Sequence, residues 1–140
     1  MSNQVTFKRR LLKLADFLET VPRKRFDYMQ WVGKDWDGKS SLNNCGTTAC
    51  ALGWATAIPS LRRAGLRLKR RVPSNYVCLK EESPNYDSAS RAAEKVFGLS
   101  FREFMWLFVP GDGHHKPSFK ATPKQVARHI RRFVKNGGVP

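Results

Sequence analysis

Residues 45–58 read Cys45-Gly46-Thr47-Thr48-Ala49-Cys50-Ala51-Leu52-Gly53-Trp54-Ala55-Thr56-Ala57-Ile58, and the rest of the chain is expected to pack around them. From Ala49 to Ile58 it carries no charge, although 26% of the chain is charged. Its apolar side chains cover most of the circumference of a helix with 3.6 residues per turn, and a helix that is apolar nearly all round is a buried one. The sequence therefore predicts a buried central helix.

Both ends of this predicted helix carry boundary signals. Thr47 or Thr48 is expected to cap the first turn through its hydroxyl. Pro59 is expected to end the helix, because it disfavours helical geometry at the preceding residue. Gly53 costs about 1 kcal/mol relative to alanine in a helix interior, so another element is expected to pack directly against it. The start of the helix is also a potential anion site, because free amides and the helix dipole point the same way; simple capping is the commoner alternative.

Length and composition predict one folded domain over residues 1–140. Hydrophobic residues make up 41% of the 140 positions and aromatic residues 11%, which supports a single core. No apolar run approaches the roughly 18 residues that span a bilayer, and the basic N-terminus has no signal-peptide core. The odd cysteine count, Cys45, Cys50 and Cys78, indicates reduced thiols. We expect a cytoplasmic protein, in the host cytoplasm if a phage encodes it, with no membrane association.

The charge balance points to anionic partners. Twenty-six Lys and Arg stand against eleven Asp and Glu, for a formal charge of +15. Such an excess opposes the compact state by self-repulsion and attracts polyanions. Nucleic acid, nucleotides and an acidic protein are the candidate partners. A basic surface without a specific ligand is the alternative, and the sequence leaves the oligomeric state open, homo-oligomers included.

The rest of the chain predicts an α+β, mainly α fold, with about four to five helices around the buried central helix and a small β-hairpin. Helical periodicity runs over 5–20, and further helices are expected over 87–97, from Ser100 to Pro110, and after Thr122. Capping boxes mark the last two starts, at Ser100 and Thr122, and Gly98 is placed to end the helix before them. The hairpin is expected to pair 66–69 with 76–79. The apolar residues of 26–32 fit neither period cleanly, so a helix and a short strand, including a third strand beside the hairpin, both stay open there. Residues 33–44 and 109–121 are expected to be exposed loops.

The central motif resembles that of a family of small uncharacterised bacterial and phage proteins with a Cys-Gly-Thr-x-x-Cys-x-x-Gly-Trp-Ala core. Further points of likeness are Ala92, Ala93, Phe97, Gly98 and Leu99, then Leu107 and Phe108, then Thr122, Pro123, Val126 and Ala127. The likeness covers most of residues 7–134. It implies a single small domain from a prokaryotic or viral source and brings no biochemical role with it.

Three kinds of catalytic or metal site have weak support. Cys45 or Cys50 with a histidine base matches no protease signature, and a buried cysteine is usually inert. The spacing of Cys45 and Cys50, with His114 and His115, fits no standard zinc site. The acidic pairs lie in polar segments with nothing to shift their pKa values. We therefore expect a binding protein rather than an enzyme, without catalytic residues, metal or cofactor.

Anion binding has the most support, because three basic groups are candidates to converge. They are the segment from Arg62 to Arg71, the loop around His115 and the final helix. Arginine offers a bidentate fork for phosphate, and exposed aromatics offer stacking surfaces for bases. Trp36, in a polar loop, is the aromatic least expected in the core. The predicted ligand-binding residues are Thr47, Thr48, Arg62, Arg63, Arg67, Lys69, Arg70, Arg71, Trp36, Tyr76, His114, His115 and Lys116.

These residues favour a non-enzymatic binding protein for a phosphate-bearing ligand. The leading hypothesis is sequestration of a nucleotide signal, a cyclic di- or oligonucleotide, by a phage-type anti-defence protein. Sequence-independent DNA or RNA binding is the first alternative, although no helix-turn-helix, KH or RRM pattern is present. A basic interaction protein for an acidic protein partner is the second.

Overall fold

The computed structural model describes residues 3–33, 36, 38, 42, 48–71 and 74–139. Over these residues the fold is α+β and mainly α, as the sequence predicted. In chain order the elements are α1 (Asn3–Leu18), the short 3-10 helix η1 (Arg23–Arg25), α3 (Ala51–Ala55), α4 (Pro59–Arg63), β1 (Leu66–Arg71), β2 (Ser74–Leu79), α5 (Ser88–Phe97), α6 (Phe101–Phe108) and α7 (Pro123–Asn136).

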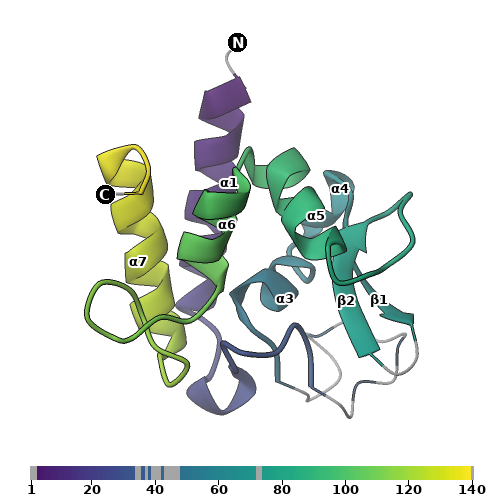
Figure 1. The fold of residues 1–140 in the computed structure, drawn as a ribbon, viewed down its shortest axis with the longest axis horizontal. Coiled ribbons are helices and arrows are strands. Elements are labelled where there is room, and N and C mark those ends of the chain that lie inside the picture. The colour runs from purple at the N-terminus through teal and green to yellow at the C-terminus, as the bar shows by residue number, and fades with distance from the viewer. Residues whose placement is uncertain are drawn as a thin grey trace.

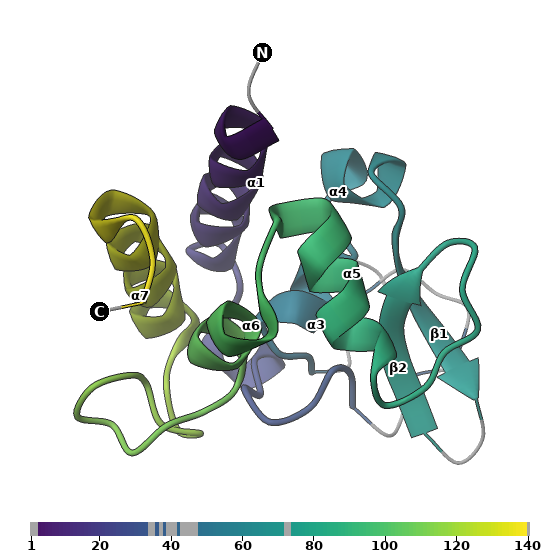
Figure 2. The same cartoon turned by 45° about the horizontal axis from the view of Figure 1, so that its top comes forward.

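The elements are arranged along the long axis of the molecule. Helices α1 and α7 lie side by side at one end, and the β1–β2 hairpin lies at the other, as both Figure 1 and Figure 2 show. Helix α5 packs against both β2 and α1, and α6 contacts α5 and α7. The short helix α3 lies between these two ends, and each of its residues is buried. The hairpin and α7 are therefore separated by the core.

The two long helices pack through apolar faces that the sequence predicted. Helix α1 buries Leu11, Leu14 and Leu18, and α7 buries Val126, Ala127, Ile130 and Phe133. At the solvent edge of this contact, the Arg131 guanidinium donates to carboxylate oxygens of Asp16, at 2.8 Å, and Glu19, at 3.0 Å. Exposed ion pairs contribute little, so the buried apolar faces hold the helices together.

The central segment is buried, as predicted, but its helix is shorter. Helix α3 ends at Ala55, and Cys50 rather than Thr48 is its N-cap, with the Cys50 Sγ accepting from the Gly53 amide at 3.4 Å. The expectation that Pro59 ends this helix is wrong. Pro59 is the first residue of α4, where its missing N–H costs nothing and its fixed φ fits the helix. Thr47 lies outside the described residues.

The segment that follows η1 packs against the start of α3 through main-chain hydrogen bonds. The amide of Ala49 donates to the Arg25 carbonyl at 3.1 Å, and that of Cys50 donates to the Gln30 carbonyl at 2.7 Å. Residues 26–32 form neither a helix nor a third strand; one isolated parallel bridge joins Phe26 to Ala49. Their periodicity was ambiguous because they are an irregular segment whose polar main chain is satisfied by the buried segment.

The boundaries of the last three helices agree with the sequence signals. Gly98 follows α5 with a φ of 67°, the left-handed conformation that glycine adopts without strain. Ser100 with Glu103, and Thr122 with Gln125, both form reciprocal capping boxes. Each of these signals acts within a few residues, so the helix boundaries can be predicted without knowing what the helices pack against. Among the described residues, no helix has both the length and the apolar character needed to cross a membrane.

The hairpin forms with the predicted strands and pairs Leu66 with Leu79 at one end and Arg71 with Ser74 at the other. Val77 and Cys78 point to opposite faces, yet both are fully buried. Strand β2 is therefore covered on both faces at this point. Of the loop expected at 33–44, only residues 33, 36, 38 and 42 are described, and Trp36 and Leu42 are in the core, at 3% and 2% exposure. The reading of Trp36 as the least core-like aromatic is wrong.

Candidate anion-binding site

The loop between α6 and α7 is folded back on itself. Gly111 pairs with Ser118 in an isolated bridge, and the Gly111 amide donates to the Pro117 carbonyl at 2.7 Å. The Asp112 carboxylate accepts from the amides of His114, at 2.8 Å, and His115, at 3.3 Å. These bonds lower the pKa of Asp112, because amides that donate to it favour its charged form. The loop therefore presents its two histidines on a short, internally bonded turn.

Lys116 joins this loop to the end of α6. Its Nζ donates to the Met105 carbonyl at 2.7 Å and lies 5.8 Å from the centre of the Trp106 ring. Partial burial lowers the pKa of Lys116 from its ordinary value of 10.5. The path of the side chain requires Gly111, because a β-carbon there would lie 2.3 Å from Lys116 Cγ. One of three ammonium donors is used, so two remain for a ligand.

A basic hollow of about 160 Å³ lies between this loop and the outer face of α7. Arg128 and Arg132 are four residues apart on one helix, so their side chains share a face, and both are exposed. The lining also includes Gln125 and the loop. The charged and imidazole-bearing residues around it are His114, His115, Lys116, Arg128, His129 and Arg132.

A second, more apolar hollow of about 520 Å³ adjoins the first. His115 and Lys116 line both, so they form a shared wall. The second hollow is lined besides by Arg102, Met105, Trp106 and Val139. Trp106 is partly buried, and it is the aromatic surface next to the basic hollow. No Asp or Glu of the described residues lines either space.

His129 is the buried member of the site, at 5% exposure. Its Nε2 lies 2.8 Å from the Trp106 carbonyl oxygen, and its ring is 5.3 Å from the Trp106 ring. Since a carbonyl only accepts, Nε2 carries the proton. Burial lowers the pKa of His129, the hydrogen bond to the Trp106 carbonyl opposes this shift in part, and the nearby charges of Lys116 and Arg132 lower the pKa as well. The arginines and the lysine therefore supply positive charge to the site, while neutral His129 orients Trp106.

The structure brings together only part of the predicted site. His114, His115 and Lys116 meet the final helix, whereas the residues on α4 and the hairpin lie at the opposite end of the molecule (Figure 1). The residues at that far end are Arg62, Arg63, Arg67, Lys69, Arg70, Arg71 and Tyr76. The predicted convergence of three basic groups is therefore reduced to two.

Most of the far basic side chains bind main-chain carbonyls. Lys69 Nζ donates to the carbonyls of Lys80, at 2.8 Å, and Glu82, at 2.9 Å. Arg70 donates to the Trp36 carbonyl at 3.2 Å, and Arg71 to that of Pro84 at 3.2 Å. Part of the positive charge of the chain is therefore structural, because these cations satisfy the carbonyls of loops around the hairpin.

Basic side chains also bind main-chain carbonyls around the short helix α4. Arg67 donates to the Arg62 carbonyl at 2.6 Å, and Arg62 to the Thr56 carbonyl at 3.4 Å. Burial, and then the charge of Arg67, lowers the pKa of Arg62. Arg63 is exposed, while Tyr76 is partly buried opposite Lys69 in the sheet.

The start of α3 offers no anion site among the described residues. Thr48 is two residues before the N-cap, and its carbonyl accepts from the Gly33 amide at 2.7 Å. Ala49, Cys50 and Ala51 around the helix start are at most 1% exposed. A ligand therefore has no access to the amides of the first turn.

Among the described residues there is no reactive cysteine and no cluster of metal ligands. The Cys50 thiol is buried among apolar groups, which raises its pKa to about 12 and suppresses the reactive thiolate. Cys50 and Cys78 are free and buried, and Cys45 lies outside the described residues. In this part of the chain, no three side chains of His, Cys, Asp or Glu are grouped to hold a metal ion.

Sequence reasoning missed Gln125, Arg128, Arg132 and Trp106 as individual site residues, although it included the final helix as a basic group. The signal was present: the capping box at Thr122 fixes where α7 begins, and the spacing of Arg128 and Arg132 puts both on its polar face. Trp106 gave no such signal, because it lies in a run of apolar residues whose sequence does not separate core from surface positions. No family model, curated protein or solved structure matches this chain, so its resemblance to small phage proteins stays a prediction.

Proposed function

We propose that this protein binds a phosphate-bearing ligand, a nucleotide, in the two adjoining hollows between the 111–118 loop, α6 and α7. One observation carries the proposal: a hollow lined by Lys116, Arg128 and Arg132 opens beside one lined by Trp106, with no carboxylate in either lining as described. Arginine and lysine bind phosphate oxygens, and an indole face stacks on a base. The two halves therefore match the two halves of a nucleotide.

The sizes of the hollows limit the ligand. Sites for whole small molecules usually measure about 300–1,000 Å³. The basic hollow, at about 160 Å³, is suited to a phosphate group, whereas the second, at about 520 Å³, has room for a base and sugar. One nucleotide unit occupies the site, and any second unit of a cyclic di- or oligonucleotide extends over α7. Sequestration of such a signal, as in a phage anti-defence protein, is the role we assign to this binding.

Binding to a panel of nucleotides tests the proposal. Thermal-shift and calorimetric titrations with inorganic phosphate, mononucleotides, cyclic dinucleotides and short oligonucleotides would identify a stoichiometric ligand, whose binding raises the unfolding temperature by mass action. The double variant Arg128→Gln/Arg132→Gln should weaken binding of that ligand by about a hundredfold or more, since two charged hydrogen bonds are lost and each removes about 1.5–3 kcal/mol. Chromatography of the ligand after incubation should recover it intact; turnover would make the protein an enzyme.

A matched double variant controls for the loss of charge. Arg63→Gln/Lys80→Gln removes the same charge from exposed positions at the far end of the molecule. It should leave nucleotide binding within about twofold of wild type, because exposed charges beyond a Debye length of about 8 Å are largely screened. If both double variants lose the same affinity for the nucleotide, the effect comes from the net charge of the protein and not from a site on α7. If the control variant loses more affinity, the site lies near the hairpin.

Nucleic-acid binding is the second candidate, and one observation favours it. Lys124, Arg128, Arg132 and Lys135 are exposed, and at intervals of four, four and three residues they form a basic stripe along α7. The stripe is about 16 Å long at 1.5 Å per residue, which is longer than one phosphate needs.

The two outer lysines separate these candidates, because neither lines the hollows. If a strand lies along α7, Lys124→Gln/Lys135→Gln should weaken binding to random duplex DNA. It should also reduce the slope of log affinity against log salt by about 0.9 for each lost phosphate contact. Binding of a mononucleotide, which fits within the hollows, should be unchanged by this variant. DNA binding that keeps its full salt slope would rule out the stripe.

A further inference from the structure

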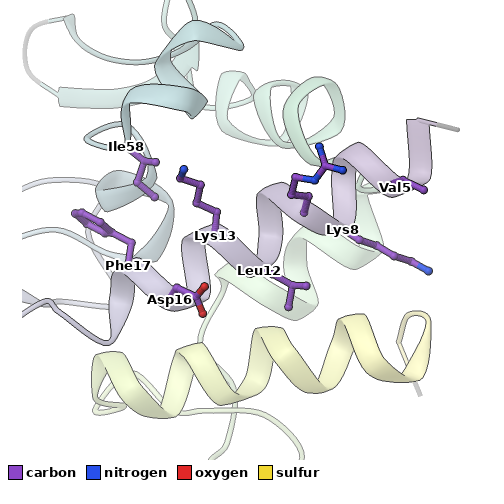
Figure 3. A pocket seen from close by; sticks show the side chains of 8 residues that line it. Val5, Lys8, Leu12, Lys13, Asp16, Phe17 and Ile58 are labelled. Atoms are coloured by element: carbon purple, nitrogen blue, oxygen red, sulfur yellow. The ribbon is translucent and has the colours of Figure 1, made fainter. Parts of the chain in front are cut away.

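A long groove on α1 is left unused by the site described above. Its volume is about 810 Å³, and it shares no lining residue with either of the two hollows. Phe17 and Ile58 form one end of it, Leu12 lies near its middle and Val5 is at the other end (Figure 3). Val5 is 46% exposed and Leu12 is 39% exposed. These apolar side chains point outward although α1 has a separate, buried core face.

The charges around this groove are mainly positive. Lys8, Arg9 and Lys13 line it, and Asp16 is its one acidic lining residue among those described. Asp16 already accepts from Arg131 of α7 at 2.8 Å. The ion pairs within the described residues are Arg91 with Glu82 and Arg131 with Asp16 and Glu19, so none neutralises the three groove cations. The groove is apolar at its centre, positive at its rim and unbalanced in charge.

We propose that this groove binds an acidic, amphipathic helix of a partner protein. From Val5 to Phe17 the groove follows α1 for twelve steps of about 1.5 Å, or about 18 Å. A helix of about three turns fits that length, with apolar residues at helical spacing against Val5 and Leu12 and glutamates beside Lys8, Arg9 and Lys13. Charge complementarity would steer the encounter, and the apolar contact would slow dissociation.

Two other occupants fit the groove less well. A second copy of the chain carries the same formal charge of +15, so like charges would oppose docking at a positive rim. A lipid surface is flat, whereas Phe17 and Ile58 line a concavity and are largely covered. A planar bilayer therefore reaches Val5 and Leu12 but leaves the end of the groove empty.

Binding of a designed peptide to the full chain tests the inference. The probe is a fluorescent helical peptide of about 14 residues, with leucines at intervals of three and four and glutamates elsewhere, measured by anisotropy. A scrambled peptide of the same composition controls for charge. Leu12→Glu should weaken binding about tenfold or more. Met29→Glu should not, because Met29 is 66% exposed and outside the groove.

Exchanging the charges of the groove and the peptide tests whether the cations at the rim of the groove contact the peptide. Lys13→Glu and Arg9→Glu should each weaken binding of the glutamate peptide. A peptide with lysines at the facing positions should bind these variants as tightly as the glutamate peptide binds the wild type. Lys95→Glu, an exposed cation outside the groove lining, should have no effect. Arg128→Gln/Arg132→Gln should also leave peptide binding unchanged, so that failure here is distinct from failure of the nucleotide site.

Other results overturn the inference. They are equal binding of the scrambled peptide, no binding of the probe at millimolar concentration, binding that Leu12→Glu leaves intact, preferential binding to anionic phosphatidylglycerol vesicles, and self-association that Leu12→Glu abolishes. Leu12→Gln, which adds no charge, keeps the test valid if Leu12→Glu fails to fold; the thermal unfolding of each variant would show this.

Discussion

The carbonyl oxygen of Trp31 lies 1.8 Å from the point where a β-carbon on residue 53 would stand, so only glycine fits at Gly53. This close approach explains a glycine in the interior of a buried helix, where it is normally unfavourable. It also fixes how the irregular 26–32 segment passes over α3.

Gly53→Ala should therefore destabilise the protein by about 3 kcal/mol, the upper range for overpacked cores. The sign of this change in the free energy of unfolding is informative, because helix propensity alone predicts that Gly53→Ala stabilises the protein by about 1 kcal/mol. Urea unfolding followed by circular dichroism measures the difference. Gly137→Ala is the comparison: nothing lies within 4 Å of its added β-carbon, so it should cost only about 1 kcal/mol for its φ of 74°. A stabilised Gly53→Ala would contradict the packing.

Tyr28 ties the irregular segment to α6. Its hydroxyl donates to the Leu107 carbonyl at 2.5 Å. Tyr28 is 2% exposed, and burial raises the pKa of its phenol. Tyr28→Phe should lower the free energy of unfolding by about 1–3 kcal/mol, because it leaves a buried carbonyl without its donor. Tyr86→Phe, at a side chain that is 85% exposed, should change it by less than about 0.5 kcal/mol. Equal effects in the two variants would show that the Leu107 bond does not form.

His129 should make stability depend on pH. Burial lowers the pKa of the folded imidazole from its ordinary value of 6.5. As the pH falls below about 6.5, the unfolded chain therefore takes up a proton before the folded chain does, and the free energy of unfolding falls. The slope from this group should not exceed about 1.4 kcal/mol per pH unit, the limit for one proton.

Urea titrations between about pH 7.5 and pH 5 measure this dependence. His129→Gln is the comparison, since its amide still has a donor for the Trp106 carbonyl but does not titrate. It should be less stable at neutral pH, through lost contact with Trp106, and should show a shallower slope below about pH 6.5. Parallel curves for the two proteins would mean that His129 is not the group responsible.

The buried cysteines should resist modification. With a pKa of about 12 for Cys50, about one thiol in ten thousand is ionised at pH 8. Burial raises the pKa of Cys78 as well. In a Cys45→Ser variant, Ellman's reagent should react with both remaining thiols only as fast as the protein unfolds, and with both at once in denaturant. Rapid labelling of Cys50 in the native protein would contradict its place in the core.

Signals that act over a few residues were enough to predict the local structure. The capping boxes at Ser100 and Thr122, the glycine after α5 and the apolar periodicity of α1 and α7 each act within a few residues, so their helices could be predicted without knowing what they pack against. The burial of the Ala49–Ile58 segment followed from its lack of charge. Its division into α3 and α4 did not, because proline after Ile58 both disfavours one helix and begins another.

The role of each charged side chain, in contrast, depends on the packing of distant segments. Arg70 and Lys69 read as ligand residues along the sequence, yet they bind carbonyls of Trp36, Lys80 and Glu82, as much as 34 residues away. Trp36 read as an exposed loop residue and is buried. Lys116 and Arg132, far from the basic hairpin, share a hollow instead. Composition fixes how many cations a chain carries, but whether each meets a carbonyl, a carboxylate or a ligand depends on which distant segments the core brings together.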